Sequence, residues 1–292
     1  MAVYCLALSH SGTILASGSY DTTTVLWNMD TYEKLLVLRE EGGYVNALDF
    51  SADDQRLFTG SNDGKLRMWC VATGELMDVI PAHDEHIRGL CTTKDGQFIA
   101  TASLDHTIKL FEADSLTLVA TLTGHTDTVY SVVATRTDNP MLVSASGDET
   151  LKIWDLTTCK EVRTLYGHRG EIYSVAVSPD TKHIIRRYII SGGLDTIVRL
   201  WCFRTGQLLF SFKGHSQSVR YVTFIPDGSK ALSGSQDKSF RVWNLDASTH
   251  TKQDKLRGHS EGVIDIAVSR DGSRCVSGSL DGTFKIWKCE TS

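Results

Sequence analysis

Residues 144–155 read SASGDETLKIWD, and close copies of this stretch recur along the chain. In each copy a serine or threonine stands four residues before an aspartate, and an aromatic residue stands six residues after it. The aspartates are Asp21, Asp63, Asp105, Asp148, Asp195, Asp237 and Asp281. The aromatic residues are Trp27, Trp69, Phe111, Trp154, Trp201, Trp243 and Trp287. Successive aspartates are 42, 42, 43, 47, 42 and 44 residues apart, and a period of this length indicates a repeat architecture.

Each repeat contains four short runs with the composition of β-strands. In the fourth repeat they cover residues 128–134, 141–146, 150–155 and 161–165, and turn-forming residues separate them. A four-stranded sheet of this size cannot bury its faces alone, so we expect a ring of seven antiparallel sheets that pack against one another. The expected unit is a single domain over residues 1–292. Its repeats cover approximately residues 1–40, 41–81, 82–123, 124–166, 167–213, 214–257 and 258–292.

The composition is that of an ordinary soluble globular protein. The 292 residues carry a net charge of −5, with 41% hydrophobic and 22% charged residues. This balance gives no reason to expect a direct nucleic-acid or membrane partner. The seven cysteines are scattered without a CxxC pair, which favours reduced thiols in the cytoplasm, with the nucleus as the alternative.

A second marker precedes the first strand of most repeats. Gly-His pairs end at His125, His168, His215 and His259, and Ala82-His83 is a variant. Each histidine precedes the aspartate of its repeat by 22, 23 or 27 residues. A Gly-His pair followed by Ser-x-Ser-x-Asp and then Trp or Trp-Asp resembles the WD-repeat β-propeller family. The resemblance covers essentially the whole chain and implies an all-β, seven-bladed propeller.

The resemblance also implies a hydrogen-bonded tetrad in each complete blade. Tryptophan, serine, aspartate and histidine can satisfy one another there, as buried polar groups require. The complete sets are His125, Ser144, Asp148, Trp154; His168, Ser191, Asp195, Trp201; His215, Ser233, Asp237, Trp243; and His259, Ser277, Asp281, Trp287. The second repeat has Glu40-Glu41 in place of Gly-His, and the third has Phe111 in place of tryptophan. We expect the first three blades to be held less firmly.

Two repeats are irregular. The last shows only three runs, over residues 262–268, 273–278 and 283–288, which predicts a three-stranded blade. One hypothesis for this irregularity is that residues upstream of Met1 are missing. The fifth repeat has about five extra residues in the stretch 181–190, where Lys182, His183, Arg186 and Arg187 surround Tyr188. An extended hairpin is favoured there over a basic docking patch.

The sequence gives little support for an enzymatic function. His125, Ser144 and Asp148 have the residue types of a hydrolase triad, but the trio recurs in three further repeats, whereas an enzyme needs one nucleophile. His83 and His86 lack a third ligand at a spacing suited to a metal. We therefore expect no catalytic residues, no metal and no cofactor. An enzyme or metal-dependent binder that uses the central channel is the alternative from a different class.

The remaining function is binding, and the resemblance places it at the upper rim of the channel. In the family, the position five after the histidine and the position before the aspartate face this rim. The candidate residues are Tyr4, Tyr20, Arg88, Tyr130, Tyr173 and Arg220. Tyrosine and arginine are enriched at interface hot spots, although tyrosines on inner strands can also merely pack between blades.

The function predicted from the sequence is that of a non-catalytic scaffold or adaptor. It would bind one or more proteins or peptides and act as a monomer within a larger complex. A peptide reader in a chromatin complex and an adaptor in a ubiquitin ligase are both open alternatives.

Overall fold

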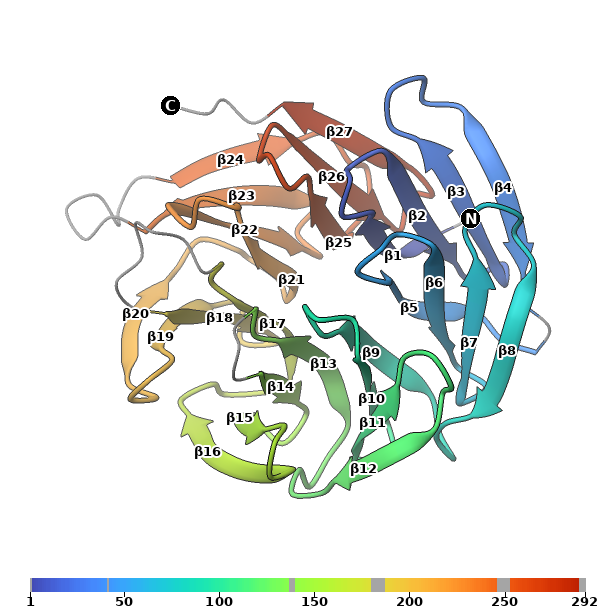
Figure 1. The fold of residues 1–292 in the computed structure, drawn as a ribbon. Coiled ribbons are helices and arrows are strands. Elements are labelled where there is room, and N and C mark those ends of the chain that lie inside the picture. The colour runs from blue at the N-terminus through green and yellow to red at the C-terminus, as the bar shows by residue number, and fades with distance from the viewer. Residues whose placement is uncertain (1, 41, 137–139, 180–186, 246–252, 289–292) are drawn as a thin grey trace.

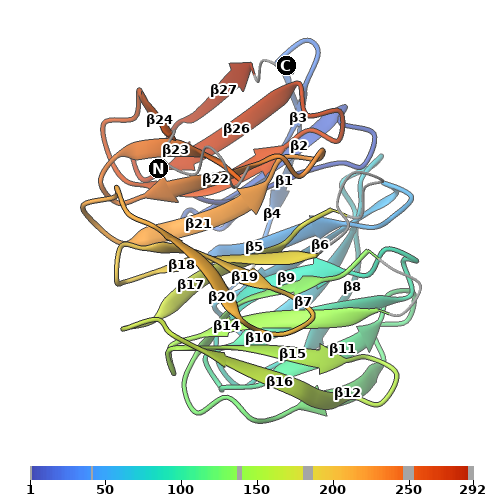
Figure 2. The same cartoon turned by 90° about the vertical axis from the view of Figure 1, so that its left-hand side faces the viewer.

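The described residues form a closed ring of seven antiparallel sheets around a central axis (Figure 1). The structure is a computed structural model that describes residues 2–40, 42–136, 140–179, 187–245 and 253–288. Each sheet is one blade, and its strands are consecutive in the chain. The innermost strands β1, β5, β9, β13, β17, β21 and β25 surround the centre in Figure 1. Figure 2 shows the ring from the side.

The first four blades have four strands each. Blade one contains β1 (Val3–Leu8), β2 (Ile14–Ser19), β3 (Thr23–Asn28) and β4 (Lys34–Arg39). Blade two contains β5 (Val45–Phe50), β6 (Arg56–Ser61), β7 (Lys65–Cys70) and β8 (Leu76–Pro81). Blade three contains β9 (Ile87–Thr92), β10 (Phe98–Ser103), β11 (Ile108–Glu112) and β12 (Leu118–Leu122). Blade four contains β13 (Val129–Ala134), β14 (Met141–Ser146), β15 (Thr150–Asp155) and β16 (Lys160–Tyr166).

The last three blades include the one that differs from the rest. Blade five contains β17 (Ile172–Val177), β18 (Tyr188–Gly193), β19 (Val198–Cys202) and β20 (Leu208–Phe212). Blade six contains β21 (Val219–Phe224), β22 (Lys230–Ser235), β23 (Ser239–Asn244) and β24 (Gln253–Arg257). Blade seven contains only β25 (Val263–Val268), β26 (Arg274–Ser279) and β27 (Phe284–Lys288) among the described residues. The seven-bladed fold and the three-stranded last blade are both confirmed.

A separate hydrophobic cluster fills each of the seven seams between neighbouring blades. At the seam of blades three and four, for example, Trp154 packs with Ile108 and Leu110. The second strand of each blade is buried along most of its length, as in β14, where every residue from Leu142 to Ser146 is buried, so both faces of a blade pack against its neighbours. The sheets therefore share their cores and depend on closure of the ring.

Within the described part of the chain, the seam between blades seven and one is closed by side-chain packing and hydrogen bonds, with no strand shared by the two sheets. Val3, Leu6, Leu15 and Met29 of blade one pack with Ala267 and Val276 of blade seven. The rings of Trp27 and Phe284 meet edge to face, with centroids 5.2 Å apart. Arg274 donates to the carbonyl of Met29 at 2.6 Å. Trp287, on the outermost strand β27, is only partly buried, whereas Trp154, Trp201 and Trp243 are fully buried.

The expected hairpin in blade five falls mostly outside the described residues. Lys182, His183 and Arg186 lie in the stretch 180–186, which the structure does not describe. The described part resumes at Arg187, and β18 begins at Tyr188 in register with β17. The extra residues are therefore accommodated between β17 and β18.

Candidate functional site

The tetrad residues of blade four lie in one continuous chain of hydrogen bonds. The indole Nε1–H of Trp154 donates to Ser144 Oγ at 2.9 Å, and Ser144 Oγ lies 2.7 Å from His125 Nε2. His125 Nδ1 lies 2.7 Å from Asp148 Oδ2. A neutral imidazole with its proton on Nδ1 satisfies every group, because it accepts from the serine and donates to the aspartate.

The same four residue types are in contact in blades five, six and seven, and in blade five Arg199 Nη1 also lies 2.6 Å from His168 Nδ1. The tryptophans Trp201, Trp243 and Trp287 donate to Ser191, Ser233 and Ser277 at 2.9, 2.8 and 2.8 Å. The histidines His168, His215 and His259 lie 2.7, 2.7 and 2.8 Å from those serines. They lie 3.0, 3.0 and 2.9 Å from Asp195, Asp237 and Asp281. The structure thus brings together all sixteen residues of the four sets.

The tetrad aspartates are held in the ionised form. Burial by itself would raise the pKa of Asp148, but the hydrogen bonds from His125 and Thr150 outweigh it and hold the pKa well below its usual range. Asp105, Asp195, Asp237 and Asp281 show the same direction, with burial again opposed by hydrogen bonds. Burial lowers the pKa of His168 and His215, although their aspartates oppose that shift. Both imidazoles are therefore favoured as neutral groups at pH 7.

Blade two replaces the histidine with an ion-paired glutamate. Glu40 is buried, and its Oε2 lies 3.2 Å from Arg67 Nη1. Arg67 Nη2 lies 2.6 Å from Asp63 Oδ2, so one guanidinium joins the two acids. Burial raises the pKa of Glu40, while hydrogen bonds to Thr59 and the charge of Arg67 oppose the shift. Sequence reasoning noted the missing histidine but did not foresee that arginine would take over its connecting role.

Blade three keeps the histidine but lacks the indole donor. His83 Nδ1 lies 2.7 Å from Asp105 Oδ2, and His83 Nε2 lies 2.8 Å from Thr101 Oγ1. Phe111 is buried and packs at the seam of blades two and three. The phenyl ring therefore preserves the packing of a tryptophan without its hydrogen bond.

The serine-histidine-aspartate trio offers no open nucleophile. Ser144 is fully buried, and its hydroxyl already contacts both Trp154 and His125. His83 is likewise engaged by Asp105 and Thr101, away from His86. No group of three or more histidine, cysteine or acidic residues in the described ranges has the arrangement of a metal site.

A β-bulge marks the rim position in every blade. The register between the first and second strands skips one residue of the inner strand each time. The skipped residues are Tyr4, Asn46, Arg88, Tyr130, Tyr173, Arg220 and Ile264. A bulge bends its strand and redirects the side chain that it carries. We call these seven residues the bulge ring; they lie at the ends of the inner strands on the upper face, which carries the tetrad aspartates.

One group of rim residues lies on blades four to six. The rings of Tyr130 and Tyr173 meet edge to face at 5.1 Å, and the Arg220 guanidinium lies 4.3 Å from the Tyr173 ring centroid. The Tyr130 hydroxyl donates to Glu171 Oε2 at 3.1 Å. Burial, with a further contribution from Glu171, raises the pKa of Tyr130 to about 12. These residues form an internally bonded network, which we call the Tyr130 network.

A second group lies on blades one and two. The ring centroids of Tyr20 and Tyr44 are 4.7 Å apart and the rings are stacked. Tyr4 lies 6.0 Å from Tyr20 and 6.2 Å from Tyr44. We call these three residues the tyrosine platform. The structure thus brings Tyr4 and Tyr20 together and separates them from the Tyr130 network.

Sequence reasoning missed Tyr44, His86 and Glu171. Each stands two residues before a bulge residue, in the connection that leads from one blade to the next. This two-residue spacing could have predicted them, because the end of each connection between blades lies beside the bulge residue. Of the predicted rim residues, Arg88 is partly buried on blade three. Its positive charge lowers the pKa of Tyr130, against the larger effect of burial.

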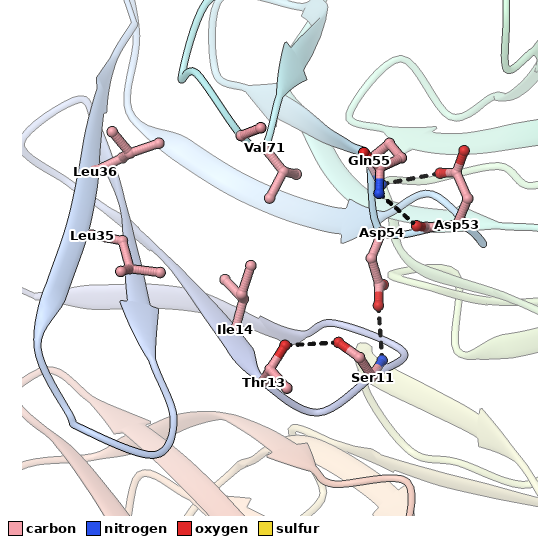
Figure 3. A pocket seen from close by; sticks show the side chains of 10 residues that line it. Ser11, Thr13, Ile14, Leu35, Leu36, Asp53, Asp54, Gln55 and Val71 are labelled. Carbon is pink, nitrogen blue, oxygen red and sulfur yellow. Dashed lines mark hydrogen bonds between the residues drawn. The ribbon is translucent and has the colours of Figure 1, made fainter.

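A separate groove of about 650 Å³ lies between blades one and two, away from the rim (Figure 3). Its walls include Ile14, Leu35, Leu36 and Val71. Asp54 lies at one end and accepts from the backbone N–H of His10 and Ser11 at 2.6 and 2.8 Å. The carboxylate therefore ties together the turns of the two blades.

Comparisons with known proteins agree with the geometry. The sequence profile of the family described as "WD domain, G-beta repeat" matches residues 1–28, 33–70, 74–112, 116–155, 159–202, 206–244 and 250–288. The chain is a member of the WD-repeat family. After the first match, each one contains the outer strand of one blade and the first three strands of the next, so the family repeat is offset from the blade by one strand.

Similar WD-repeat proteins match only part of this chain. Protein ROOT INITIATION DEFECTIVE 3 of Arabidopsis thaliana is 45% identical over 58 residues, which are 20% of this chain and 13% of that protein. Lissencephaly-1 homolog 1 of Paramecium tetraurelia is 38% identical over 65 residues, 22% of this chain and 16% of that protein. WD repeat and SOCS box-containing protein 1 of Homo sapiens is 47% identical over 49 residues, 16% of this chain and 12% of that protein. Each match thus spans less than a fifth of the relative's length.

Proposed function

We propose that this WD-repeat propeller is a non-catalytic scaffold that binds protein or peptide partners through its upper rim. The observation that carries the proposal is the bulge ring. Each of the seven inner strands carries one bulge residue near the same end, and three of the seven are tyrosines and two are arginines. Tyrosine and arginine supply large contact areas with polar ends, which suits the centre of a protein interface.

The rigidity of the ring supports the same proposal. The tetrads lie directly beneath the rim and fix the connections between blades, so a partner meets a surface that is already ordered. A preordered surface loses little conformational entropy when it binds. Membership in the WD-repeat family and similarity to a relative named for a SOCS box fit an interaction role. In the described ranges, no helix is long and apolar enough to cross a membrane.

The narrower roles are distinguished by partner identity. A peptide reader in a chromatin complex and an adaptor in a ubiquitin ligase would use the same rim with different partners. We propose that the chain acts as a monomer within such a complex, in the cytoplasm or the nucleus.

Affinity purification from the source cell tests the proposal. The variant Tyr130→Ala, Tyr173→Ala, Arg220→Ala removes most of the Tyr130 network, and Tyr166→Ala is the control, because Tyr166 is 75% exposed on the outer strand β16. Circular dichroism must first show that both variants are folded. Selective loss of partners from the rim variant is expected. Identical partner lists would place binding on another surface and contradict the proposal.

A further inference from the structure

The tyrosine platform differs from the Tyr130 network in what its side chains contact. The hydroxyl of Tyr130 donates to Glu171, and the Tyr173 ring carries the guanidinium of Arg220. Within the described ranges, the hydroxyls of Tyr4, Tyr20 and Tyr44 make no hydrogen bond, and no cationic side chain lies over their rings. Arg220 of this chain therefore already covers the Tyr173 ring, whereas the rings of the tyrosine platform carry no cation from the described residues.

The platform is also accessible. Tyr20 is 57% exposed although its ring is stacked on that of Tyr44. Tyr4 and Tyr44 are partly exposed beside it. The platform continues to His86, whose ring meets Tyr44 edge to face at 6.3 Å. A partner can thus reach a continuous aromatic surface on blades one to three.

The charged residues next to the platform in the sequence are mostly acidic. Asp84 and Glu85 immediately precede His86 and are both exposed. Asp21 follows Tyr20; burial would raise the pKa of Asp21, but hydrogen bonds from Thr23 outweigh it and lower the pKa, so the carboxylate is ionised at neutral pH. Arg88, two residues after His86, is the basic residue of the bulge ring on blades one to three. The negative face of an aromatic ring and nearby carboxylates both favour a cation.

We propose that the tyrosine platform binds a lysine or arginine side chain of an extended segment from a protein partner. The inference rests on the proposed function, since it names the partner chemistry for one half of the same rim. Arginine is the better fit, because its flat guanidinium stacks on an aromatic ring and keeps its N–H groups free for carboxylates. Arg220 on Tyr173 is an example of this geometry within the same chain.

Tyrosine-ring NMR tests the inference on the full chain. The protein is prepared with ¹³C-labelled tyrosine rings, and its nine tyrosines are assigned with single Tyr→Phe variants. The probe is a blocked peptide of alternating arginine and glycine, and a matched peptide of alternating glutamate and glycine is the control. We expect the arginine peptide to shift the ring signals of Tyr20 and Tyr44 in a saturable manner and to leave Tyr166 unchanged. The glutamate peptide should shift none of them.

Variants of Tyr20 separate ring contact from simple charge attraction. Tyr20→Ala should weaken the arginine peptide roughly two- to fivefold, whereas Tyr20→Phe, which keeps the ring, should stay within about twofold of the original affinity. Tyr20 is exposed enough for both variants to fold, and circular dichroism checks this. Equal shifts with both peptides, no shifts at millimolar peptide, or unchanged affinity in Tyr20→Ala would overturn the inference.

The peptide-binding test of the platform and the partner-binding test of the proposed function can fail independently. Loss of partners in the Tyr130 network variant, together with no response of Tyr20 to the arginine peptide, would overturn only the platform. Binding of the peptide at Tyr20 and Tyr44, together with unchanged partner lists in variants of both rim groups, would support the platform as a cation site and overturn the scaffold proposal.

Discussion

The carboxylate of Asp265 accepts a hydrogen bond from the backbone N–H of Leu6 at 2.6 Å, across the seam between blades seven and one. Its other oxygen accepts from the N–H of Ile266 at 2.7 Å. Two other seams have a serine in the equivalent place: Ser174 accepts from Val222 at 3.0 Å, and Ser131 accepts from Val175 at 3.4 Å. The shortest of these bonds thus lies at the seam of the three-stranded blade.

Removal of this acceptor should destabilise the ring more than removal of its counterparts. Asp265→Ala leaves the Leu6 N–H buried without a partner and should lower the free energy of unfolding by about 2–3 kcal/mol. Ser174→Ala should cost about 1 kcal/mol, because its seam joins two complete blades. Urea unfolding followed by tryptophan fluorescence measures both. Equal losses would show that the Asp265 bond has no special role.

Asp265 should also make stability depend on pH. Burial raises its pKa to about 7, although the hydrogen bonds from the Leu6 and Ile266 amides oppose the shift. In the unfolded chain the carboxyl titrates near its ordinary value of about 3.9. Between these two values the folded chain holds a proton that the unfolded chain has lost. The contribution of Asp265 to the free energy of unfolding should therefore fall as pH rises from about 4 to 7, by at most about 4 kcal/mol.

The variant Asp265→Asn isolates this dependence from other titrating groups. It cannot ionise, so the difference in unfolding free energy between it and the original chain should vary with pH across this window. Urea unfolding at half-unit intervals of pH measures the difference. A constant difference from pH 4.5 to 8 would show that Asp265 titrates normally.

The tetrads should contribute strongly to stability. Asp148→Ala removes the acceptor of His125 Nδ1, of the Thr126 and Thr150 amides and of the Thr150 hydroxyl, so we expect a loss of about 2–4 kcal/mol. Glu149→Gln, at an exposed position in the same turn, is the control and should change stability by less than about 0.5 kcal/mol. A loss below about 0.5 kcal/mol for Asp148→Ala would contradict a stabilising role of the tetrad.

The arginine of blade two should be more sensitive than a surface cation. Arg67→Met leaves Glu40 and Asp63 without the guanidinium that lies between them, and we expect a loss of about 3 kcal/mol. Combining it with Glu40→Gln should recover part of this loss, because one buried charge is then removed. A double-mutant cycle by urea unfolding measures the coupling. Strictly additive effects would contradict the ion-paired network.

The rim should tolerate substitution without loss of the fold. Tyr130→Ala combined with Arg220→Ala removes side chains that are partly exposed at the rim and lie outside the buried core. We expect the double variant to keep a cooperative transition and to lose no more than about 2 kcal/mol. Differential scanning calorimetry checks this. Unfolding of the variant at room temperature would show that these residues belong to the core.

Much of the fold was readable from the sequence because each repeat carries its own hydrogen-bonding partners. The spacing of Ser144, Asp148 and Trp154 fixes one strand, one turn and the next strand, and seven copies define a ring. The three strands of the last blade followed from the same counting. The repeated motif could not predict contacts that occur in one blade, such as the ion pairs of Arg67 with Glu40 and Asp63.

The candidate site was predictable only in part. Counting from the histidine identified the rim positions, but it gave no sign that each of them is a bulge or that the rim divides into two groups. That division depends on which side chains reach one another across blades. Tyr44 and Glu171 decide it, and both stand outside the repeated motif.

The seam between blades seven and one has a mechanical consequence. Among the described residues, the contacts at this seam are noncovalent and include the Asp265 and Arg274 hydrogen bonds and the packing of Trp27 on Phe284. A pulling force applied between β1 and β27 would load these few contacts directly, without a shared strand to distribute it. The ring should then open at this seam first and release its blades in sequence. A partner that binds blades seven and one at the same time would resist this opening.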